Sequence, residues 1–330
     1  MLNEKMMLSL CDPNEKHENL YLCNQGGIIS ESGTRYEVNN GIPNLVKVTN
    51  IQKNQYAVNL FSQVADGYDE YHYLSYTIFN SDEEEVRNSV IDKLHIDNKN
   101  NIKVLELSAG TGRDSVLIKK RMTDDSELHV QDISFDMLNI LKGKFNDDEI
   151  FITQSNAEAL PYKDNTFDAI YSYGGIGMDL YADLNKQMQE ISRVAKRGAK
   201  VVLVGLGVGP WLYKTEFATI LINHNEHYMN KLDLSVLPIE ARNVNVSWIL
   251  NGAVYCIEFE IGEGEPEANF DFEIPGIRGG SLRSRYYGKL EGVSPEVKRM
   301  AYEAREKLGI SMYDFLNEVI GSAAKKVINE

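Results

Sequence analysis

A run of small residues follows a short apolar segment and precedes a stretch with helical periodicity. The apolar segment is Val104-Leu105-Glu106-Leu107, and the small residues are Ser108-Ala109-Gly110-Thr111-Gly112. Small side chains let a backbone approach a ligand closely, and open α/β sheets bind ligands at the carboxyl ends of their strands. A tight strand-to-helix turn without a ligand would use the same residues, so this glycine loop alone leaves both interpretations open.

Three polar features after the glycine loop favour a nucleotide-like ligand. Asp132 ends the next apolar run, roughly 20 residues on, where an acid can accept hydrogen bonds from ribose hydroxyls. Asn156-Ala157-Glu158 follows a third run and could meet an adenine edge, and Ser172 follows a fourth. Asp132 could instead be a helix N-cap and Asn156 a turn residue, but their order and spacing together indicate a binding site.

Strand and helix patterns alternate over residues 103–206, which predicts βαβ units with right-handed crossovers and a parallel sheet. The expected strands cover residues 104–107, 128–132, 150–152, 167–171 and 200–204. The expected helices cover residues 114–122, the stretch that ends near residue 144, and residues 184–195.

The flanking segments have other patterns. Residues 1–48 are typical of short strands and turns, and residues 50–100 of helices, with Asp82 as an N-cap before three acids. After residue 209 we expect a helix over 212–232, then two strands, 244–250 and 253–261, joined at Asn251-Gly252, a strong hairpin signal. Helical periodicity returns at 295–308 and 311–328. The expected domains are residues 1–48, 49–261 and 262–330.

Composition limits the partners. The formal net charge is −15, and a field of that sign repels phosphate backbones, although a local basic patch could override it. No apolar run in the chain approaches the length of a membrane helix, which is about 20 residues. Residues 1–10 lack a signal-peptide pattern. Cys11, Cys23 and Cys256 are too scattered for a disulfide framework. We expect a cytoplasmic protein with reduced thiols and no membrane partner.

Four segments together resemble the class I S-adenosylmethionine-dependent methyltransferases, in particular the branch with ubiquinone-biosynthesis and other small-molecule enzymes. They are residues 104–112, 130–138, 156–169 and 190–198, and the resemblance extends over about 56–207. It implies an α/β fold with a doubly wound, mostly parallel seven-stranded sheet, and S-adenosylmethionine as cofactor with S-adenosylhomocysteine as product. Ser108 stands where the family usually has its first glycine, and Asn156 where it often has Asp.

The resemblance also implies roles for single residues. Glu106 and the backbone around Ser108 and Gly110 would hold the methionine part of the cofactor, Asp132 the ribose, and Ile133, Asn156 and Ala157 the adenine. Tyr68, in a helix before the core, would cover the cofactor. The full expected cofactor site is Tyr68, Glu106, Ser108, Ala109, Gly110, Gly112, Asp132, Ile133, Asn156, Ala157 and Ser172.

Dinucleotide binding is the alternative on the same fold. The spacing Gly-x-Gly-x-x-Gly requires a third glycine, but Ser115 stands there. Glu106 before the loop suits an ammonium group better than a pyrophosphate, which binds helix N–H groups away from negative charge. Both observations favour the methyltransferase.

Residues 36–45 resemble the end of the zinc-ribbon-like Trm112 domain, whose family holds zinc through two cysteine pairs. Here Ile29 and Ser32 stand where the second pair should be, and Cys11, His17 and Cys23 supply three ligands at most, whereas a structural zinc site needs four. We therefore expect a metal-free segment that is stabilised by its own apolar residues and by docking. An unrelated β-rich extension is the alternative.

The acceptor is less well defined. Residues 277–289 carry four cations and no acid, so we expect Arg283 and Arg285, alternating in an extended loop, to orient an anionic small molecule, with His224 nearby. A solvated, charge-balancing loop is the alternative. An RNA methyltransferase and a non-catalytic binding module are the other functional possibilities. The identity of the acceptor, the methylated atom, a general base and the oligomeric state stay open.

Overall fold

The computed structural model describes residues 4–15, 18–23, 26–47, 51–146, 149–175, 183–276 and 279–329. The chain forms two compact units, Met1–Glu265 and Pro266–Glu330. Among the described helices, none combines the length and the apolar character needed to cross a membrane.

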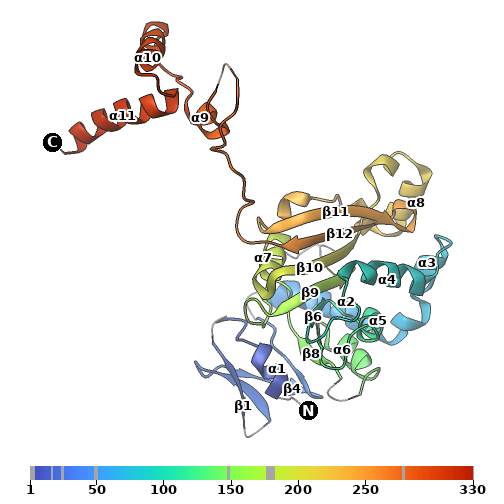
Figure 1. The fold of residues 1–330 in the computed structure, drawn as a ribbon. Coiled ribbons are helices and arrows are strands. Elements are labelled where there is room, and N and C mark those ends of the chain that lie inside the picture. The colour runs from blue at the N-terminus through green and yellow to red at the C-terminus, as the bar shows by residue number, and fades with distance from the viewer. Residues whose placement is uncertain are drawn as a thin grey trace. The chain divides into compact units, whose positions relative to one another are not determined.

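A seven-stranded sheet forms the centre of the first unit, with the strand order β11-β12-β10-β9-β6-β7-β8 (Figure 1). Neighbouring strands from β10 to β8 are parallel, and β12 is antiparallel to both β10 and β11. The strands are β6 (Lys103–Leu107), β7 (Glu127–Asp132), β8 (Phe151–Gln154), β9 (Phe167–Tyr173), β10 (Ala195–Leu206), β11 (Ala241–Ile249) and β12 (Val254–Ile261). The predicted doubly wound, mostly parallel sheet is confirmed. Strands such as β6, Lys103–Leu107, are largely buried because helices cover both faces of a sheet of this kind.

Helices cover both faces of this sheet. Buried side chains of α4, α5 and α6 pack on one face, and those of α7 pack on the other with the N-terminal segment. The α-helices of this unit after the N-terminal segment are α2 (Ile51–Tyr71), α3 (Leu74–Thr77), α4 (Glu83–Ile91), α5 (Arg113–Lys119), α6 (Phe135–Lys142), α7 (Leu184–Val194) and α8 (Glu216–His224). The 3₁₀ turns are η2 (Asp92–Leu94), η3 (Pro210–Leu212), η4 (Glu226–Met229), η5 (Leu234–Val236) and η6 (Leu250–Gly252).

Side-chain caps explain where several helices begin. The Asp82 carboxylate accepts a hydrogen bond from the Glu85 N–H at 2.9 Å, so the predicted N-cap of α4 is confirmed. The cap of α6 is Ser134, whose hydroxyl accepts from the Met137 N–H. Asp132 is therefore not the cap of that helix, so its carboxylate can bind the glycine loop instead.

The predicted helix over residues 212–232 is wrong, whereas the hairpin after it is confirmed. Asn225 has an extended backbone and its side chain accepts from the His227 N–H at 3.0 Å, so the helix stops at His224 and restarts as η4. In the hairpin, Ile249 pairs with Val254 across a turn in which Asn251 takes a left-handed conformation.

The N-terminal segment extends the edge of the main sheet. The Leu45 N–H donates to the Gln154 carbonyl at 2.8 Å, so this segment covers the outer strand β8. The Lys103 ammonium lies 2.8 Å from the Ser9 hydroxyl and 3.0 Å from the Glu127 carboxylate. The segment contains α1 (Glu4–Ser9), β1 (Leu20–Cys23), β2 (Gly27–Ser30), β3 (Arg35–Tyr36), β4 (Val38–Asn39) and β5 (Ile42–Pro43).

The second unit is helical. It contains α9 (Leu282–Tyr287), α10 (Pro295–Leu308) and α11 (Met312–Ile328). The two long helices predicted from the periodicity are confirmed, with Ser294 and Ser311 as their N-caps. The extended loop expected around Arg283 is wrong, because Ser281 and Ser284 form a capping box that starts α9 there.

We predict that Glu127 makes the fold sensitive to acid. Burial opposes ionisation of this carboxyl, but hydrogen bonds from His129 and Lys103 outweigh it and hold its pKa at about 2. Since the folded pKa lies below the unfolded one, this contribution to stability is present above about pH 4.5 and is lost as the pH falls towards 2.

Urea unfolding at pH 7, 4 and 3 measures this effect. Glu127→Gln should be destabilised at pH 7 and should approach the wild type at pH 3. An equal difference between the two proteins at all three pH values would contradict the assignment. Glu84→Gln, which removes an exposed acid of α4 in the same unit, is the matched control.

Candidate functional site

The glycine loop connects β6 to α5 through an unusual backbone. Ser108, Gly110 and Gly112 all have positive φ, at 54°, 54° and 82°. The Ala109 N–H donates to the carbonyl of Gln131 at 3.0 Å, which ties the loop to the neighbouring strand β7. Glycine is required at such positions because other residues rarely adopt them, and Ser108 is the strained exception.

The two glycines of this loop have different surroundings. A Cβ at Gly112 would lie 2.6 Å from the Leu141 Cγ, so glycine is needed there for the close packing of α5 on α6. A Cβ at Gly110 would meet no atom within 4 Å. Gly110 therefore borders open space at the carboxyl ends of the strands, which is where a ligand can approach the backbone.

Asp132 lies where the glycine loop meets the end of β7. One carboxylate oxygen accepts from the Gly110 N–H and the other from the Ser134 N–H, both at 2.8 Å. The residue is only 7% exposed, and this burial raises its pKa despite the two backbone donors. Each carboxylate oxygen has a second lone pair, so Asp132 can fix the loop and still accept hydrogen bonds from ligand hydroxyls.

Glu106 lies behind the glycine loop. It is 2% exposed, and one of its carboxylate oxygens accepts from the Ser115 hydroxyl at 2.5 Å. Burial, followed by the nearby charge of Asp114, raises its pKa well above the ordinary value. Ser115, which stands where a dinucleotide site has its third glycine, thus fixes the first turn of α5 to this acid.

Ser172 and Gly175 bring the end of β9 to the glycine loop. Ser172 pairs in register with Leu107, and its hydroxyl is buried with no hydrogen-bond partner among the described residues. A Cβ at Gly175 would lie 2.0 Å from the Ser108 Cβ, so only glycine fits there. A buried hydroxyl without a protein partner, next to the glycine loop, suits a ligand that carries polar groups.

Ile133, Asn156 and Ala157 follow the adjacent strands β7 and β8. The Ser155 N–H donates to the Asp132 carbonyl at 3.0 Å, which holds the two strand ends together. The Asn156 side chain accepts from the Glu158 N–H at 2.8 Å, so this residue does shape a turn. Ile133 is half-buried and Ala157 is buried beside it in the same strand-end region.

Sequence reasoning missed how α2 is connected to the glycine loop. Tyr68 is half-buried on α2, and its neighbour Asp69 accepts from the Thr111 hydroxyl at 2.6 Å and from Arg113 at 3.1 Å. The Lys144 ammonium completes the contact, 2.5 Å from the same carboxylate. An acid next to the expected covering tyrosine was the available signal in the sequence.

The expected acceptor residues Arg283 and Arg285 have partners within the second unit. Arg283 pairs with Asp271 at 2.9 Å, and Arg285 donates to the Gly279 carbonyl at 2.9 Å, both inside the second unit. They lie on the helix α9, where side chains two residues apart point about 200° from each other, so they do not share a side. His224 is exposed at the last residue of α8 and does not line the pocket between α7, β10 and β12.

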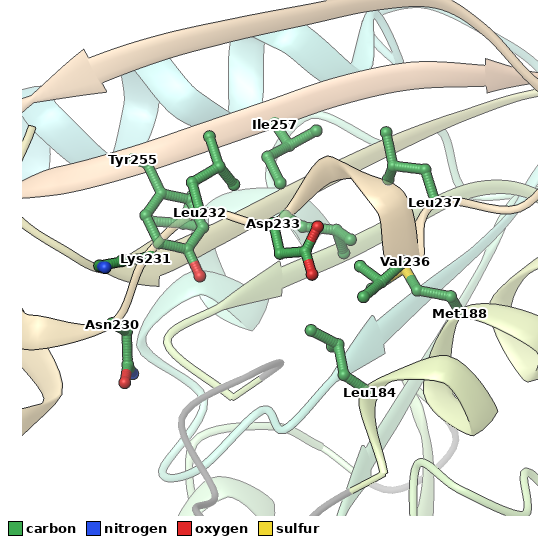
Figure 2. Close-up of a pocket in the computed structure, with 12 residues that line it drawn as sticks. Leu184, Met188, Asn230, Lys231, Leu232, Asp233, Val236, Leu237, Tyr255 and Ile257 are labelled. Atoms are coloured by element: carbon green, nitrogen blue, oxygen red, sulfur yellow. The ribbon is translucent and has the colours of Figure 1, made fainter. Parts of the chain in front are cut away.

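A pocket of about 180 Å³ opens between α7, β10, β12 and the segment 230–237 (Figure 2). Its walls are mainly aliphatic, with a phenol, an ammonium, a carboxylate and an amide at the rim. The lining residues are Leu184, Met188, Leu203, Val204, Asn230, Lys231, Leu232, Asp233, Val236, Leu237, Tyr255 and Ile257. Sequence reasoning missed them, because they gather from segments far apart in the chain.

Glycines position the phenol of this pocket. A Cβ at Gly205 would lie 2.3 Å from the Tyr255 hydroxyl, and one at Gly207 would lie 3.0 Å from the Tyr255 ring. The ring therefore lies across the end of β10, where only glycine leaves room for it. Its burial raises the pKa of the Tyr255 hydroxyl, so this group is a neutral hydrogen-bond donor at pH 7.

Strand register connects this pocket to the glycine loop. Leu107 pairs with Ser172, Ser172 with Leu203, and Leu203 with Ile257, in one row across four strands. Two strand spacings, about 10 Å, separate the residue that enters the glycine loop from the pocket wall. A ligand that extends from Asp132 past Ser172 would thus end beside the pocket.

The described residues show no group of three or more His, Cys, Asp or Glu side chains that could hold a metal ion. His17, which sequence analysis considered as a possible ligand, lies outside the described residues.

The sheet order, the glycine loop and the acid after the second parallel strand define a class I S-adenosylmethionine-dependent methyltransferase domain. Residues 49–212, just under half of the chain, match the model of the ubiE/COQ5 methyltransferase family. S-adenosylmethionine is the methyl donor of this class, and the buried Ser172 hydroxyl, the Asp132 carboxylate and the opening at Gly110 fit its polar groups.

Named relatives agree with this class. The demethylmenaquinone methyltransferase of Lactiplantibacillus plantarum is 30% identical over 147 residues, 43% of this chain and 59% of that protein. The ubiquinone/menaquinone biosynthesis C-methyltransferase UbiE of Pectobacterium carotovorum is 31% identical over 110 residues, 32% of this chain and 43% of that protein. The chain thus spans about half the length of these relatives.

A solved structure of Haemonchus contortus phosphoethanolamine N-methyltransferase 2 with S-adenosyl-L-methionine has a TM-score of 0.48 and 15% identity. The match covers 62% of this chain and 60% of that one.

We predict that Asp132→Ala weakens binding of S-adenosylhomocysteine by about 10- to 100-fold, because a charged hydrogen-bond partner contributes about 1–3 kcal/mol. Titration calorimetry measures the affinity, and thermal unfolding shows whether the variant is folded. Asp136→Ala, an exposed acid in the first turn of α6, is the matched control. Unchanged affinity in a folded Asp132→Ala protein would remove this residue from the cofactor site.

The two loop glycines should separate stability from binding. Alanine at either position costs about 1–2 kcal/mol for the left-handed backbone. Gly112→Ala should lose a further about 1–3 kcal/mol because its Cβ overlaps Leu141. Gly110→Ala should instead weaken S-adenosylhomocysteine binding more than Gly112→Ala does, since its Cβ enters the open space. Equal effects of both variants on stability and on affinity would contradict this division.

Proposed function

We propose that this chain transfers the methyl group of S-adenosylmethionine to a small-molecule acceptor with a largely apolar body, held in the pocket between α7, β10 and β12. The observation that carries this proposal is the row Leu107–Ser172–Leu203–Ile257, which leads from the glycine loop to the pocket wall. Donor and acceptor would then meet at the end of β9.

On the donor side, the residues bind and orient. Asp132 would accept hydrogen bonds from the ribose hydroxyls while it holds the loop through Gly110. Ile133 and the Asn156-Ala157 turn would lie against the adenine, and the Ser172 hydroxyl would satisfy a polar group of the methionine part. Glu106 lies behind the glycine loop, with its carboxylate bound to Ser115. Its carboxyl would therefore act on the methionine part of the cofactor mainly through its charge and by holding the loop in place.

The cofactor, when bound, supplies an electrophilic methyl group on a sulfonium, so the protein needs to supply alignment and a dry site. The aliphatic walls of the pocket exclude water from the acceptor. Neutral Tyr255 can donate a hydrogen bond to an acceptor oxygen, from a position fixed by Gly205. Methylation at carbon would break the methyl–sulfur bond of the donor, form a C–C bond and leave S-adenosylhomocysteine, and the proton of that carbon would pass to solvent water at the pocket mouth.

We further propose a quinol-type acceptor that is methylated at carbon. The names of the relatives from L. plantarum and P. carotovorum refer to demethylmenaquinone and to ubiquinone and menaquinone, and the apolar pocket with polar groups at its rim suits such a ring. An anionic acceptor has weaker support, because the charges of Lys231 and Asp233 offset each other at the rim. The tail residues Arg283 and Arg285 already have partners in their own unit.

We predict that Val236→Trp fills the pocket and raises the KM for a short-chain 1,4-naphthohydroquinone at least ten-fold. Val236 lines the pocket from η5, whereas the glycine loop is on other strands, so the affinity for S-adenosylhomocysteine should change little. A methylation assay and calorimetry measure the two quantities. Ile239→Trp, exposed and outside the lining, is the matched control.

Three results would count against the proposal. Equal kinetics for Val236→Trp and Ile239→Trp would remove the pocket from acceptor binding. Cofactor binding without methylation of any quinol would contradict the quinol acceptor but not the methyltransferase. Absence of S-adenosylhomocysteine binding in the wild type would contradict the function altogether.

A further inference from the structure

The carboxylate of Asp69 attaches the last turn of α2 to the glycine loop. One of its oxygens accepts from the Thr111 hydroxyl at 2.6 Å and from the Arg113 guanidinium at 3.1 Å. The other oxygen lies 2.5 Å from the Lys144 ammonium, and the Asp69 carbonyl also accepts from Arg113 at 3.2 Å. Thr111 is 1% exposed in the middle of the glycine loop, so this contact reaches the loop itself.

The partners of Asp69 are held in place independently of α2. Arg113 also donates to both carboxylate oxygens of Glu83 on α4, to one of them at 2.7 Å. Lys144 follows α6, whose buried side chains pack on the sheet. Donors from the glycine loop, from α5 and from the end of α6 thus form a fixed socket for one side chain of α2.

Apolar packing contributes little to holding α2. Among the side chains of α2 that the structure describes, none belongs to either hydrophobic cluster of the first unit, and only Ala65 is buried. Phe61, Val64 and Tyr71 are exposed. An element with few buried apolar contacts moves locally more easily than the core does, so the position of the last turn of α2 depends on Asp69.

Tyr68 precedes Asp69 in the chain, so the same contact decides where this phenol lies. Its ring centre lies 5.0 Å from that of the His72 ring, and burial raises the pKa of its hydroxyl. The nearby charge of Arg87 lowers this pKa, and the charge of Asp132 raises it. The Tyr68 hydroxyl therefore lies among the charged groups around the glycine loop, beside the carboxylate proposed to bind the ribose.

We propose that Asp69 is a positioning residue that keeps Tyr68 closed over the bound methyl donor and thereby sets how long the donor stays bound. The proposal rests on the proposed binding of the donor at the glycine loop and Asp132. A phenol above the donor blocks its exit, and without the Asp69 carboxylate the last turn of α2 can move away. Differences in affinity between variants of one site lie mainly in the dissociation rate.

Surface plasmon resonance of the full chain with S-adenosylhomocysteine measures both rate constants. Asp69→Ala should raise the dissociation rate constant about ten-fold, as expected for a lost hydrogen bond to a charged group, and leave the association rate constant within about two-fold. Tyr68→Ala should also speed dissociation. The double variant Y68A/D69A should dissociate no faster than Tyr68→Ala alone, because the acid acts through the phenol.

Glu70→Ala removes the neighbouring, exposed acid of the same turn and is the matched control, so its two rate constants should equal those of the wild type. Thr111→Val should speed dissociation, whereas Thr111→Ser keeps the hydroxyl and should not. Thermal unfolding shows whether each variant is folded. If Asp69→Ala is unfolded, Asp69→Asn, which removes the charge and keeps the shape, takes its place in the same test.

Three outcomes overturn the proposal. Asp69→Ala could leave dissociation unchanged, or it could lower only the association rate constant, as a contact that merely shapes the loop would. It could also speed dissociation by the same factor in the Tyr68→Ala protein, which would assign Asp69 to the glycine loop alone. Absence of S-adenosylhomocysteine binding in the wild type would instead contradict the proposed function, and this proposal with it.

Discussion

The hydrogen bonds between Asp132 and the N–H groups of Gly110 and Ser134 are the contacts on which the site depends. They join the end of β6, the end of β7 and the start of α6 through one buried carboxylate. A loop with three positive-φ positions among five residues would otherwise have many conformations. Because Asp132 selects one of them, the open face of Gly110 and the hydroxyl of Ser172 are presented to the same space.

A cluster of charged side chains from α4 and α5 also holds the elements around the glycine loop. Arg87 of α4 is buried, pairs with Asp114 of α5 and lies 2.7 Å from Glu83. The Tyr173 ring lies 4.7 Å from its guanidinium, so the end of β9 is part of the same cluster. Buried acids near Glu106 would repel one another without this cation, and such a network is stable only while all its members are paired. It therefore gives α4 and α5 one fixed relation to the glycine loop.

Much of the fold was predictable from local patterns. The strand 104–107, the N-cap Asp82 and the hairpin at Asn251-Gly252 follow from periodicity and from residues with strong backbone preferences. The helix over 212–232 was mispredicted, because the Asn225 side chain competes with the helical hydrogen bond, which hydrophobic periodicity does not register. In the tail, the side chains of Ser281 and Ser284 cap a helix where an extended loop was expected, and hydrophobic periodicity does not register this either.

The site divides in a similar way. The glycine loop, Asp132 and Asn156 each lie at or just after the end of a predicted strand, so their order in the chain indicated their use. The tie between Asp69 and Thr111, 42 residues apart, and the pocket around Tyr255 depend on side chains that meet only after folding. No pattern of spacing connects Leu184 with Val236. Such contacts follow from the register of β9, β10 and β12, which a single sequence does not reveal.

The Tyr255 ring lies on β12, and most other residues of the pocket come from the segment 230–237, whereas the match to the ubiE/COQ5 family ends at residue 212. Under the proposed function, the residues that would bind the donor and most of those that would bind the acceptor occupy consecutive parts of the chain, with Leu184, Met188, Leu203 and Val204 as the exceptions. Mutations after residue 212 would then remodel much of the acceptor wall while the donor half stays under its own constraints. In evolution, a lineage with this architecture could acquire new acceptors without losing its methyl donor.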